Sequence, residues 1–416
     1  MSQIVLTLRQ PAQFGSKARR DNVLSTMEHI PGSVVRGALA AAWLARNGIS
    51  RPGTPGREEF LNLFEGPVRY GALLRDGTEF MSLAVVGHKY APTDACAIVD
   101  YDRAAGAEPP PYCPDCGSPL DQQRGLTGER DAPRRRTSVA ITPDGTAGEG
   151  ALFTRETIAA EQVFRGTVTA PDDRLLKILD GLGPVRVGGR RTTHGLADVT
   201  VTRDASPPLP QRRPDGTLVV RLRSPAIFTD DHGRPSREPS AHELQDALGV
   251  PARVTRRWTR WEESGGWHVA SGLPKPQELT VAAGSTYLIS AERALPDSAL
   301  ARLSARGLGL RRHEGFGDLA PPPVLRPGRA ERERDARHRR ELGDKAAPLI
   351  RILIDERLGA RLRSLMREHA GGNTQATAQL RGTANRHPDT DVQAAMTVFL
   401  ALPPADAAYL AEELGR

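Results

Sequence analysis

Aromatic residues and lysine are both scarce in this 416-residue chain. Phenylalanine, tyrosine and tryptophan together make up 5% of it, and no expected strand carries an aromatic motif of the kind that stacks nucleic-acid bases. Lysine occurs at five positions only, so arginine supplies almost all of the 57 basic residues. Arginine binds phosphate through a planar fork of donors, although a preference for GC-rich codons would also favour it. A bound nucleic acid would therefore be recognised mainly through its backbone and shape.

The sequence also lacks an apolar run of about 18 residues, which a membrane-spanning helix needs. Its first residues, 1–8, have neither the basic nor the long apolar segment of a secretion signal. Three cysteines are too few for a disulfide framework. We therefore expect a cytoplasmic protein that makes no membrane contact. The net charge of +7 is compatible with a polyanionic partner, but a generally basic proteome would give the same value.

Two glycine-rich segments carry adjacent arginines, and each comes near the end of one half of the chain. Glycine lets the backbone approach a ligand and expose its N–H groups, while arginine matches the oxygens of a phosphate. The alternative for each segment is a hairpin turn with solvated arginines, but the recurrence of the pattern favours a bound polyanion. The predicted binding residues of these segments are Gly188, Gly189, Arg190, Arg191, Arg311, Arg312, Gly315, Phe316 and Gly317.

A third candidate segment precedes an alanine-rich run, where Gly32 and Ser33 are followed by Arg36. The run is a strong helix former, and Ser33 is the predicted N-cap. A helix start presents unpaired N–H groups and a partial positive charge, which suit a phosphate. The alternative is an ordinary connection between a strand and a helix. Gly32, Ser33 and Arg36 are therefore added to the predicted binding residues.

The order of predicted elements indicates an α+β fold with two ferredoxin-like (RRM-like) domains in tandem. Strands are expected near residues 4–8, 162–169 and 198–202 in the first half, with a helix near 174–182. The first domain would span residues 1–205, with an irregular insertion at about 91–150 that is rich in proline, glycine and charge. A second domain would span residues 206–325. A helical C-terminal region would occupy residues 326–416.

The insertion contains Cys113 and Cys116, at the spacing with which structural zinc sites hold two thiolates. A complete site needs four ligands, and the candidates for the other two are Cys96 and His88, the nearest histidine. The alternative is a reduced, metal-free turn. Structural zinc is therefore the only cofactor that the sequence suggests, and no organic cofactor is expected.

Catalytic residues have weaker support. Asp94, Asp100 and Asp102 lie in a loop of the kind that holds a metal for RNA cleavage, but acidic residues in loops are mostly solvated. His29 precedes the first glycine turn and is the best-placed general base, yet no acid partner is evident. We therefore expect a binding protein rather than an enzyme.

The chain resembles the RAMP superfamily of CRISPR-associated proteins, and within it the large RAMP subunit of type III-D effector complexes. The matching segments follow one another in the family's order over residues 4–320, and the C-terminal helical region lies outside the resemblance. They are Ile30–Ser33 with Arg36–Leu39, Arg136–Ile141, Gly150–Phe153, Phe164–Gly166, Gly188–Gly195, Gly266–Trp267, Gly272–Pro276, Ala283–Ser285 and Glu314–Gly317. One departure is Gly195-Leu196-Ala197, where the family usually closes the loop with Gly-x-Gly.

This resemblance implies two tandem RAMP domains that bind CRISPR RNA within an antiviral ribonucleoprotein complex. The chain would hold the 5′ handle of the guide and contact other RAMP subunits and the large polymerase-like subunit. Target RNA would be bound through pairing with the guide. The alternative within the same class is a RAMP endoribonuclease that processes guide precursor or cleaves target RNA.

Overall fold

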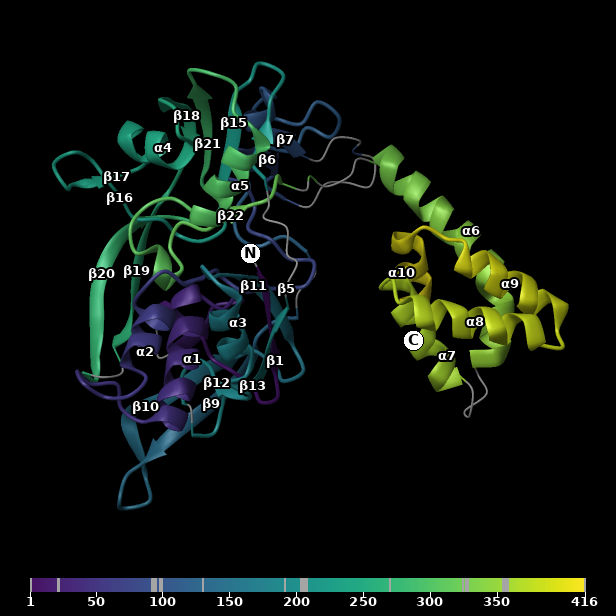
Figure 1. The fold of residues 1–416 in the computed structure, drawn as a ribbon, viewed down its shortest axis with the longest axis horizontal. Coiled ribbons are helices and arrows are strands. Elements are labelled where there is room, and N and C mark those ends of the chain that lie inside the picture. The colour runs from purple at the N-terminus through teal and green to yellow at the C-terminus, as the bar shows by residue number, and fades with distance from the viewer. Residues whose placement is uncertain are drawn as a thin grey trace. The chain divides into compact units, whose positions relative to one another are not determined.

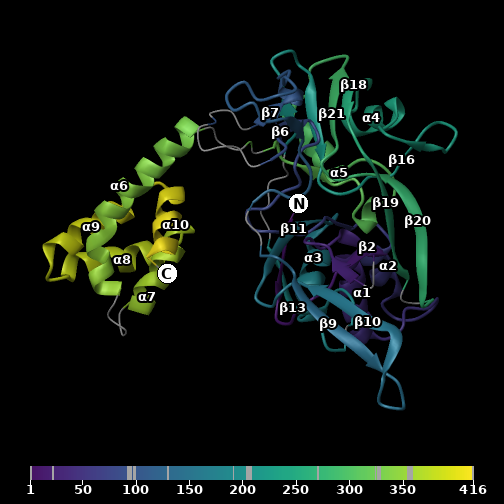
Figure 2. The same cartoon turned by 180° about the vertical axis from the view of Figure 1, so that it is seen from behind.

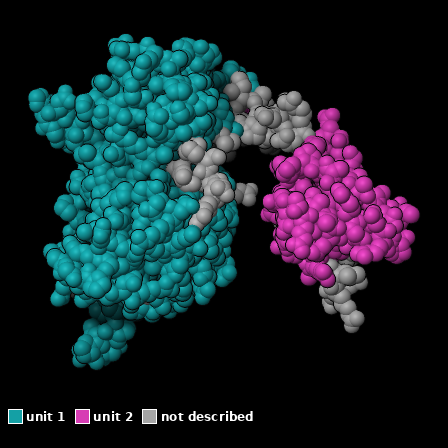
Figure 3. Space-filling view, viewed as in Figure 1, with its two compact units in different colours: residues 1–91, 100–325 teal, residues 92–99, 326–416 magenta. Residues whose placement is uncertain are grey.

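The computed structural model of the protein describes residues 2–20, 23–90, 96, 100–128, 131–190, 192–202, 209–268, 271–323, 325, 329–353 and 359–414. The chain divides into two compact units (Figure 3). One comprises residues 1–91 and 100–325, and the other comprises residues 92–99 and 326–416. Among the described helices, none combines the length and the apolar character needed to cross a membrane.

The first sheet of the larger unit is built around the N-terminal strand. Strand β1 (Ser2–Leu8) pairs antiparallel with both β11 (Val163–Thr169) and β13 (Leu196–Thr202), which confirms the three strands predicted here. The strand order is β12-β13-β1-β11-β4, with β5 also pairing with β11. The edge strands are β12 (Val185–Arg186), β4 (Arg69–Tyr70) and β5 (Leu74–Arg75). Residues of β1 alternate between buried and half-buried, as expected for a sheet with one covered face.

Three helices cover the buried face of this sheet (Figure 1). They are α1 (Gly32–Asn47), α2 (Arg57–Phe64) and α3 (Asp173–Asp180). Helix α3 confirms the helix predicted near residues 174–182, and the Asp172 carboxylate caps it by accepting a hydrogen bond from the Leu175 backbone N–H. The shared core includes Ile4, Leu6, Leu39, Trp43, Phe64 and Phe164.

The second sheet of the larger unit has the order β14-β15-β21-β18, and β22 also pairs with β15. Its strands are β14 (Gln211–Arg212), β15 (Leu218–Leu222), β18 (Ala252–Trp258), β21 (Thr286–Ala291) and β22 (Leu319–Ala320). Helices α4 (Ala241–Leu248) and α5 (Asp297–Arg306) pack on one face. The core there includes Leu218, Val220, Leu244, Tyr287, Ile289 and Leu303.

The other face of the second sheet is covered by the chain around Leu83, Ala84 and Ala104. Val219 and Leu288 are paired across β15 and β21, and both point away from the helices because alternate strand residues face opposite sides. They pack with Leu83, Ala84, Ala104 and Trp258 in a small separate core. The covering segment includes β6 (Val85–His88), β7 (Asp100–Asp102), the 3-10 turn η1 (Arg103–Ala105) and β8 (Leu120–Gln122).

The segment at about 91–150 is therefore less irregular than its composition suggests. Besides β7 and β8 it contains β9 (Arg134–Ile141) and the start of β10 (Ala147–Thr157), which form an antiparallel hairpin (Figure 2). Residues of β9 are exposed on nearly all positions, so the strand lacks the alternation by which it would be recognised in a sequence. The hairpin extends a sheet of order β2-β3-β10-β9, with β2 (Gly15–Arg20) and β3 (Val23–Thr26).

Two further hairpins complete the larger unit. Strands β19 (Trp261–His268) and β20 (Leu273–Val281) form a long one, seen along the edge of the molecule in Figure 1. Short strands β16 (Phe228–Thr229) and β17 (Pro235–Ser236) form the other.

The smaller unit confirms the predicted helical C-terminal region. Its helices are α6 (Arg329–Leu353), α7 (Gly359–Ala370), α8 (Thr374–Arg386), α9 (Thr390–Leu400) and α10 (Pro404–Glu413). They enclose their own apolar core, which includes Leu342, Leu349, Met366, Leu380, Phe399 and Leu410.

Candidate functional site

The loop between α5 and β22, residues 307–318, packs against the start of α1. A Cβ atom added at Gly315 would lie 2.7 Å from the Cα atom of Gly32, and one added at Gly32 would lie 2.8 Å from the Cα atom of Gly315. Both distances are too short for a real side chain. The fold therefore brings together two of the three segments that the sequence singled out, although they are far apart in the chain.

The start of α1 differs from the prediction. The prediction that Ser33 is the N-cap is wrong, because the helix begins at Gly32 and its N-cap is Pro31, with φ −60°, ψ 144° and no side-chain hydrogen bond. A Cβ atom at Gly32 would lie 2.0 Å from the backbone oxygen of Tyr70. The absence of a side chain at Gly32 therefore allows the Tyr70 backbone to pack against the helix start, and this contact sets the position of that start.

The side chain of Arg36 is engaged within the fold. Its guanidinium donates a hydrogen bond to the backbone oxygen of Phe64 and forms an ion pair with Glu65. These contacts tie α1 to the end of α2. A role for Arg36 in binding RNA stays a prediction.

Arg311 is also held by carboxylates of its own chain. It donates two hydrogen bonds to Glu314, at 2.8 and 2.9 Å, and one to Glu278 at 2.8 Å, and its guanidinium lies 5.3 Å from the ring centre of Phe316. Lys275 adds a 2.7 Å contact to Glu314. Burial by itself would raise the pKa of Glu314, but the hydrogen bonds from Arg311 and Lys275 outweigh it and lower the pKa to about 2. Arg311 and Glu314 thus organise the loop from within.

Arg312, the next residue, is in a different environment. Within the described part of the chain, its guanidinium has no hydrogen bond or ion pair. It lines a pocket together with Arg69 of β4 and Arg306 at the end of α5. Sequence reasoning missed Arg69 and Arg306, since neither stands next to a second arginine and only the fold brings them to Arg312.

The Gly188 loop is held against residues near the N-terminus. The Gly189 backbone N–H donates a 2.9 Å hydrogen bond to the Gln13 oxygen. A Cβ atom at Gly188, where φ is +77°, would lie 2.3 Å from that oxygen. Arg190 is exposed with φ at +52°, whereas Arg191 lies outside the described residues. Gly188 therefore allows the Gln13 backbone to pack against this loop, and the exposed Arg190 remains available to a ligand.

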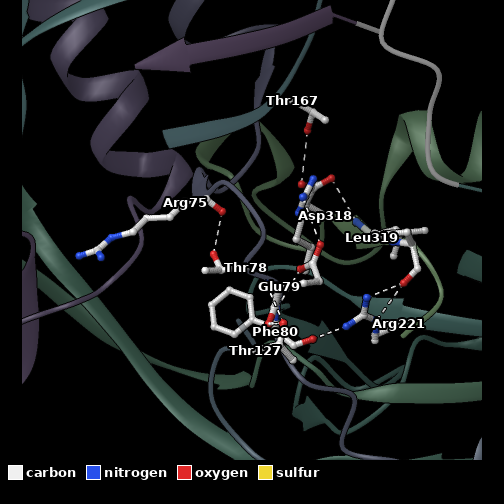
Figure 4. A network of polar contacts seen from close by, with 11 residues as sticks. Arg75, Thr78, Glu79, Phe80, Thr127, Thr167, Arg221, Asp318 and Leu319 are labelled. Carbon is white, nitrogen blue, oxygen red and sulfur yellow. Dashed lines mark hydrogen bonds and ion pairs between the residues drawn. The ribbon is translucent and has the colours of Figure 1, made fainter. Parts of the chain in front are cut away.

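A polar network fixes the loop between the two sheets (Figure 4). The hydroxyl of Thr167 on β11 donates to the Asp318 carboxylate at 3.4 Å, and the Asp318 backbone N–H donates to the Ser224 hydroxyl at 2.9 Å. Burial raises the pKa of Asp318, with Arg223 as the main opposing charge. Arg223 also forms a 3.1 Å ion pair with Glu79. Asp318 therefore connects the first sheet with the second directly beside the pocket.

The predicted metal ligands lie together. His88, Cys96, Cys113 and Cys116 each offer one ligand atom, and these four atoms all lie within 4.8 Å of one another. The Cys116 sulfur is 3.2 Å from Nε2 of His88. Hydrogen bonding, first with the Ser118 side chain, lowers the pKa of the Cys116 thiol to about 6. Three sulfurs and one imidazole form a donor set that suits zinc, so the cluster can hold a metal ion.

The catalytic candidates are placed less favourably. The His29 ring packs edge-on against Phe80, with ring centres 5.0 Å apart, and burial lowers its pKa to about 4. The Asp102 carboxylate caps η1 by accepting a 2.8 Å hydrogen bond from the Ala104 backbone N–H. Asp100 lies on β7, and Asp94 is outside the described residues. With so low a pKa, His29 would be a weak general base.

The comparison with protein families finds one similarity, which covers part of this chain. Residues 120–320 match the model of a family described as CRISPR-associated protein (Cas_Cmr3). The chain is therefore similar to Cas_Cmr3 over these residues. No curated protein matches it in sequence.

Several solved structures are distantly similar. A type III-B Cmr-beta complex bound to cognate target RNA contains a chain with 12% identity and a TM-score of 0.43, which covers 78% of this chain and 99% of its own. The same complex with AMPPnP contains a chain with 12% identity and a TM-score of 0.42, at 69% and 86% coverage. A Csm3–Csm4 subcomplex of a type III-A interference complex gives 11% identity and a TM-score of 0.32, at 79% and 99% coverage. These TM-scores are too low to establish a shared fold.

Proposed function

We propose that this chain is the guide-binding, Cmr3-like subunit of a type III CRISPR interference complex. The observation that carries the proposal is the site at the start of α1, where the Gly315 loop presents Arg312 without an internal partner in the described residues. The similarity to Cas_Cmr3 over residues 120–320 supports this class of complex. Guanidinium groups beside a glycine-rich backbone suit the phosphates of an RNA.

The surfaces of the two sheets support recognition of the RNA backbone rather than of stacked bases. Base-stacking domains present aromatic side chains on the open face of a sheet. Here the open face of the first sheet is formed by residues such as Gln3, Val5 and Thr7 on β1 with Arg165 on β11. The corresponding face of the second sheet is covered by the chain around Leu83. Neither sheet therefore offers an aromatic platform in its described strands.

The strand order supports the interpretation of both halves as ferredoxin-like RAMP domains. The first sheet contains the order β13-β1-β11-β4, with α1 following β1 and α3 following β11. The second contains β22-β15-β21-β18, with α4 following β15 and α5 following β21. In chain order both sheets read fourth, first, third, second, which is the arrangement of a β-α-β-β-α-β unit.

The finer role follows from the resemblance of the sequence. We propose that the chain holds the 5′ handle of the guide, contacts the large polymerase-like subunit, and acts in a complex of subtype III-D. Target RNA then pairs with the guide and not with this chain. The C-terminal helical unit has no assigned part in this role.

The test is purification of the complex assembled on this chain, followed by sequencing of the RNA that it retains. A short guide with a constant 5′ end is the expected result. Replacing Arg190 and Arg191 by alanine, and separately Arg312, should weaken guide binding and reduce its salt dependence, because fewer counterions are released. Arg302→Ala, an exposed arginine of α5, is the matched control. Absence of any short RNA, or unchanged binding in every variant, would refute the proposal.

The alternative activity, cleavage of guide precursor or target RNA, is decided in the same complex. Replacement of His29, and separately of Asp94, Asp100 and Asp102 together, should leave every RNA cut of the assembled complex unchanged. The low pKa of His29 and the capping role of Asp102 support this expectation. Loss of one specific cut with normal RNA content would identify the chain as an endoribonuclease.

We further propose that the cluster of His88, Cys96, Cys113 and Cys116 binds one structural zinc ion. Cys113 and Cys116 lie in a turn closed by a 2.8 Å hydrogen bond from the Gly117 backbone N–H to the Cys113 oxygen. His88 ends β6, which belongs to the segment that covers the second sheet. A bound ion would therefore link the turn to β6 and hold the covering segment in place.

Metal analysis of the purified protein tests this proposal. We expect about one zinc per chain, and loss of the metal with a lower melting temperature for Cys113→Ser and Cys116→Ser. His232→Ala, an exposed histidine in a turn, should retain the metal. A metal-free parent protein whose melting temperature does not respond to added zinc would contradict the assignment.

A further inference from the structure

A small pocket lies at the junction of the two sheets of the larger unit. Its walls come from β4, β11, the end of α5 and the Gly315 loop, and it is partly open to solvent. The polar lining consists of Arg69, Thr167, Thr169, Ser304, Arg306, Arg312 and Asp318. Three guanidinium groups thus face one carboxylate in a confined space.

The arginines of this pocket are only partly compensated by the chain. Arg306 has a 3.8 Å contact with Asp246, and Glu243 lies near enough to Arg312 to attract it. Arg69 has no ion pair or hydrogen bond of its side chain within the described residues, and Asp318 is the carboxylate that attracts it. Burial, and then the charge of Arg312, lowers the pKa of Arg69 to about 10. Like charges held this close favour an anion between them.

The walls of the pocket approach each other closely through glycine residues. At Gly71 an added Cβ atom would lie 2.5 Å from the Thr167 hydroxyl and 2.7 Å from the Asp318 carboxylate, so no side chain fits there. Gly315 and Gly317 form the opposite wall. Asp318 is already held by Thr167 and by the Leu319 backbone N–H. Arg69 and Arg312 are therefore the arginines of this lining that have no hydrogen bond or ion pair within the described residues.

We propose that this pocket binds one phosphate group of the RNA backbone, with Arg69 and Arg312 as its donors. This inference rests on the proposed function, because RNA is taken as the source of the phosphate. It adds Arg69, which no sequence pattern indicated, and it places the bound strand at the seam between the two sheets. Arg311, although adjacent to Arg312, holds the loop and does not enter the pocket lining.

Two measurements on the full chain test the pocket, using Arg69→Gln with Arg312→Gln, and Arg302→Gln as the charge-matched control. In the first, inorganic phosphate is added at constant ionic strength. The melting temperature of the parent and the control should rise by about 3 °C at about ten times the dissociation constant, while the double variant should not respond. An equal rise of the melting temperature in all three proteins would refute the proposal that this pocket binds phosphate.

In the second measurement, guide RNA is titrated at several salt concentrations. The double variant should lose about tenfold in affinity, and the slope of log affinity against log salt should fall by about one. A parent that responds to phosphate but binds no RNA would refute the proposed function and leave a pocket for a free phosphorylated ligand. A double variant with parental RNA affinity and slope would exclude the RNA backbone as the source.

Discussion

Adjacent arginines of the same loop have different roles in this protein. Arg311 is bound to Glu314 and Glu278, whereas Arg312 faces Arg69 across a pocket. The sequence pattern predicts the same role for both arginines, because they are adjacent and precede the same glycines. Their difference arises from Glu278 and Arg69, which come from other parts of the chain. At the scale of single residues, the partner and not the residue type decides which arginine is available to a ligand.

Glu314→Gln should destabilise the protein by about 1–3 kcal/mol, because Arg311 and Lys275 lose a charged acceptor in a largely buried site. Chemical denaturation measures the free energy of unfolding. Glu263→Gln, which changes an exposed carboxylate on β19, is the control and should differ little from the parent. Equal stabilities of the two variants would show that the ion pairs contribute nothing.

The same residue predicts a pH dependence. The pKa of Glu314 is lowered from 4.5 to about 2 in the folded protein, so its charge stabilises the fold at pH values above 4.5. This contribution is lost as the pH falls from 4.5 towards 2. The difference in unfolding free energy between the parent and Glu314→Gln should therefore shrink from about pH 7 to about pH 3. A difference that stays constant over this range would contradict the assignment.

At the scale of elements, glycine positions determine how closely α1 and the Gly315 loop approach each other. Gly32, Gly315 and the backbone of Tyr70 meet without side chains between them. This contact explains why the helix begins at Gly32 and not after a serine cap. It also means that Gly32→Val would disturb the fold before it could report on RNA binding, so changes at Arg312 are the more informative test.

Two alanine substitutions in the same helix should have opposite effects. Gly32→Ala places a Cβ atom 2.0 Å from the Tyr70 oxygen and should destabilise the protein by more than about 2 kcal/mol. Gly37→Ala adds a methyl group with no atom within 4 Å and should stabilise it by about 0.5–1 kcal/mol, because alanine favours a helix over glycine. Thermal or chemical denaturation measures both. A neutral Gly32→Ala would refute the close packing.

At the scale of the larger unit, buried polar contacts join the second sheet to the chain at residues 79 and 80. Arg221 on β15 donates hydrogen bonds to the backbone oxygen of Phe80 (Figure 4) and to that of Pro321. Arg223 pairs with Glu79. Glu79 and Phe80 shortly precede Leu83, which packs on the covered face of this sheet, so these contacts hold that part of the chain against the sheet.

Arg221→Met should lower the free energy of unfolding by about 3 kcal/mol, because two buried backbone oxygens lose their donor. Arg253→Met, at an exposed position of β18, should change it by less than about 0.5 kcal/mol. Denaturant unfolding monitored by tryptophan fluorescence measures the difference. If both variants were equally stable, the hydrogen bonds of Arg221 would contribute nothing to the stability of the fold.

The main strands, α3 and the helical C-terminal region were predictable because local patterns specify them. Alternation predicted β11, and the helix predicted near residues 174–182 is α3. Strand β9 was missed because its side chains are exposed on both faces and show no alternation. The N-cap is Pro31 and not Ser33, because the close contact of Gly32 with the Tyr70 backbone fixes the helix start. This tertiary contact outweighs the local preference for serine at the N-cap position.

The sequence by itself determined which chemical groups this protein can offer: many arginines, few aromatic residues, glycine in the loops, and three cysteines with a histidine that could hold a metal ion. These are properties of composition and short spacing, which do not depend on the fold. Only the tertiary structure decided which of these groups meet. It brought His88 and Cys96 to Cys113 and Cys116, and it placed Arg69 opposite Arg312. Such contacts join residues distant in sequence, and no local pattern records them.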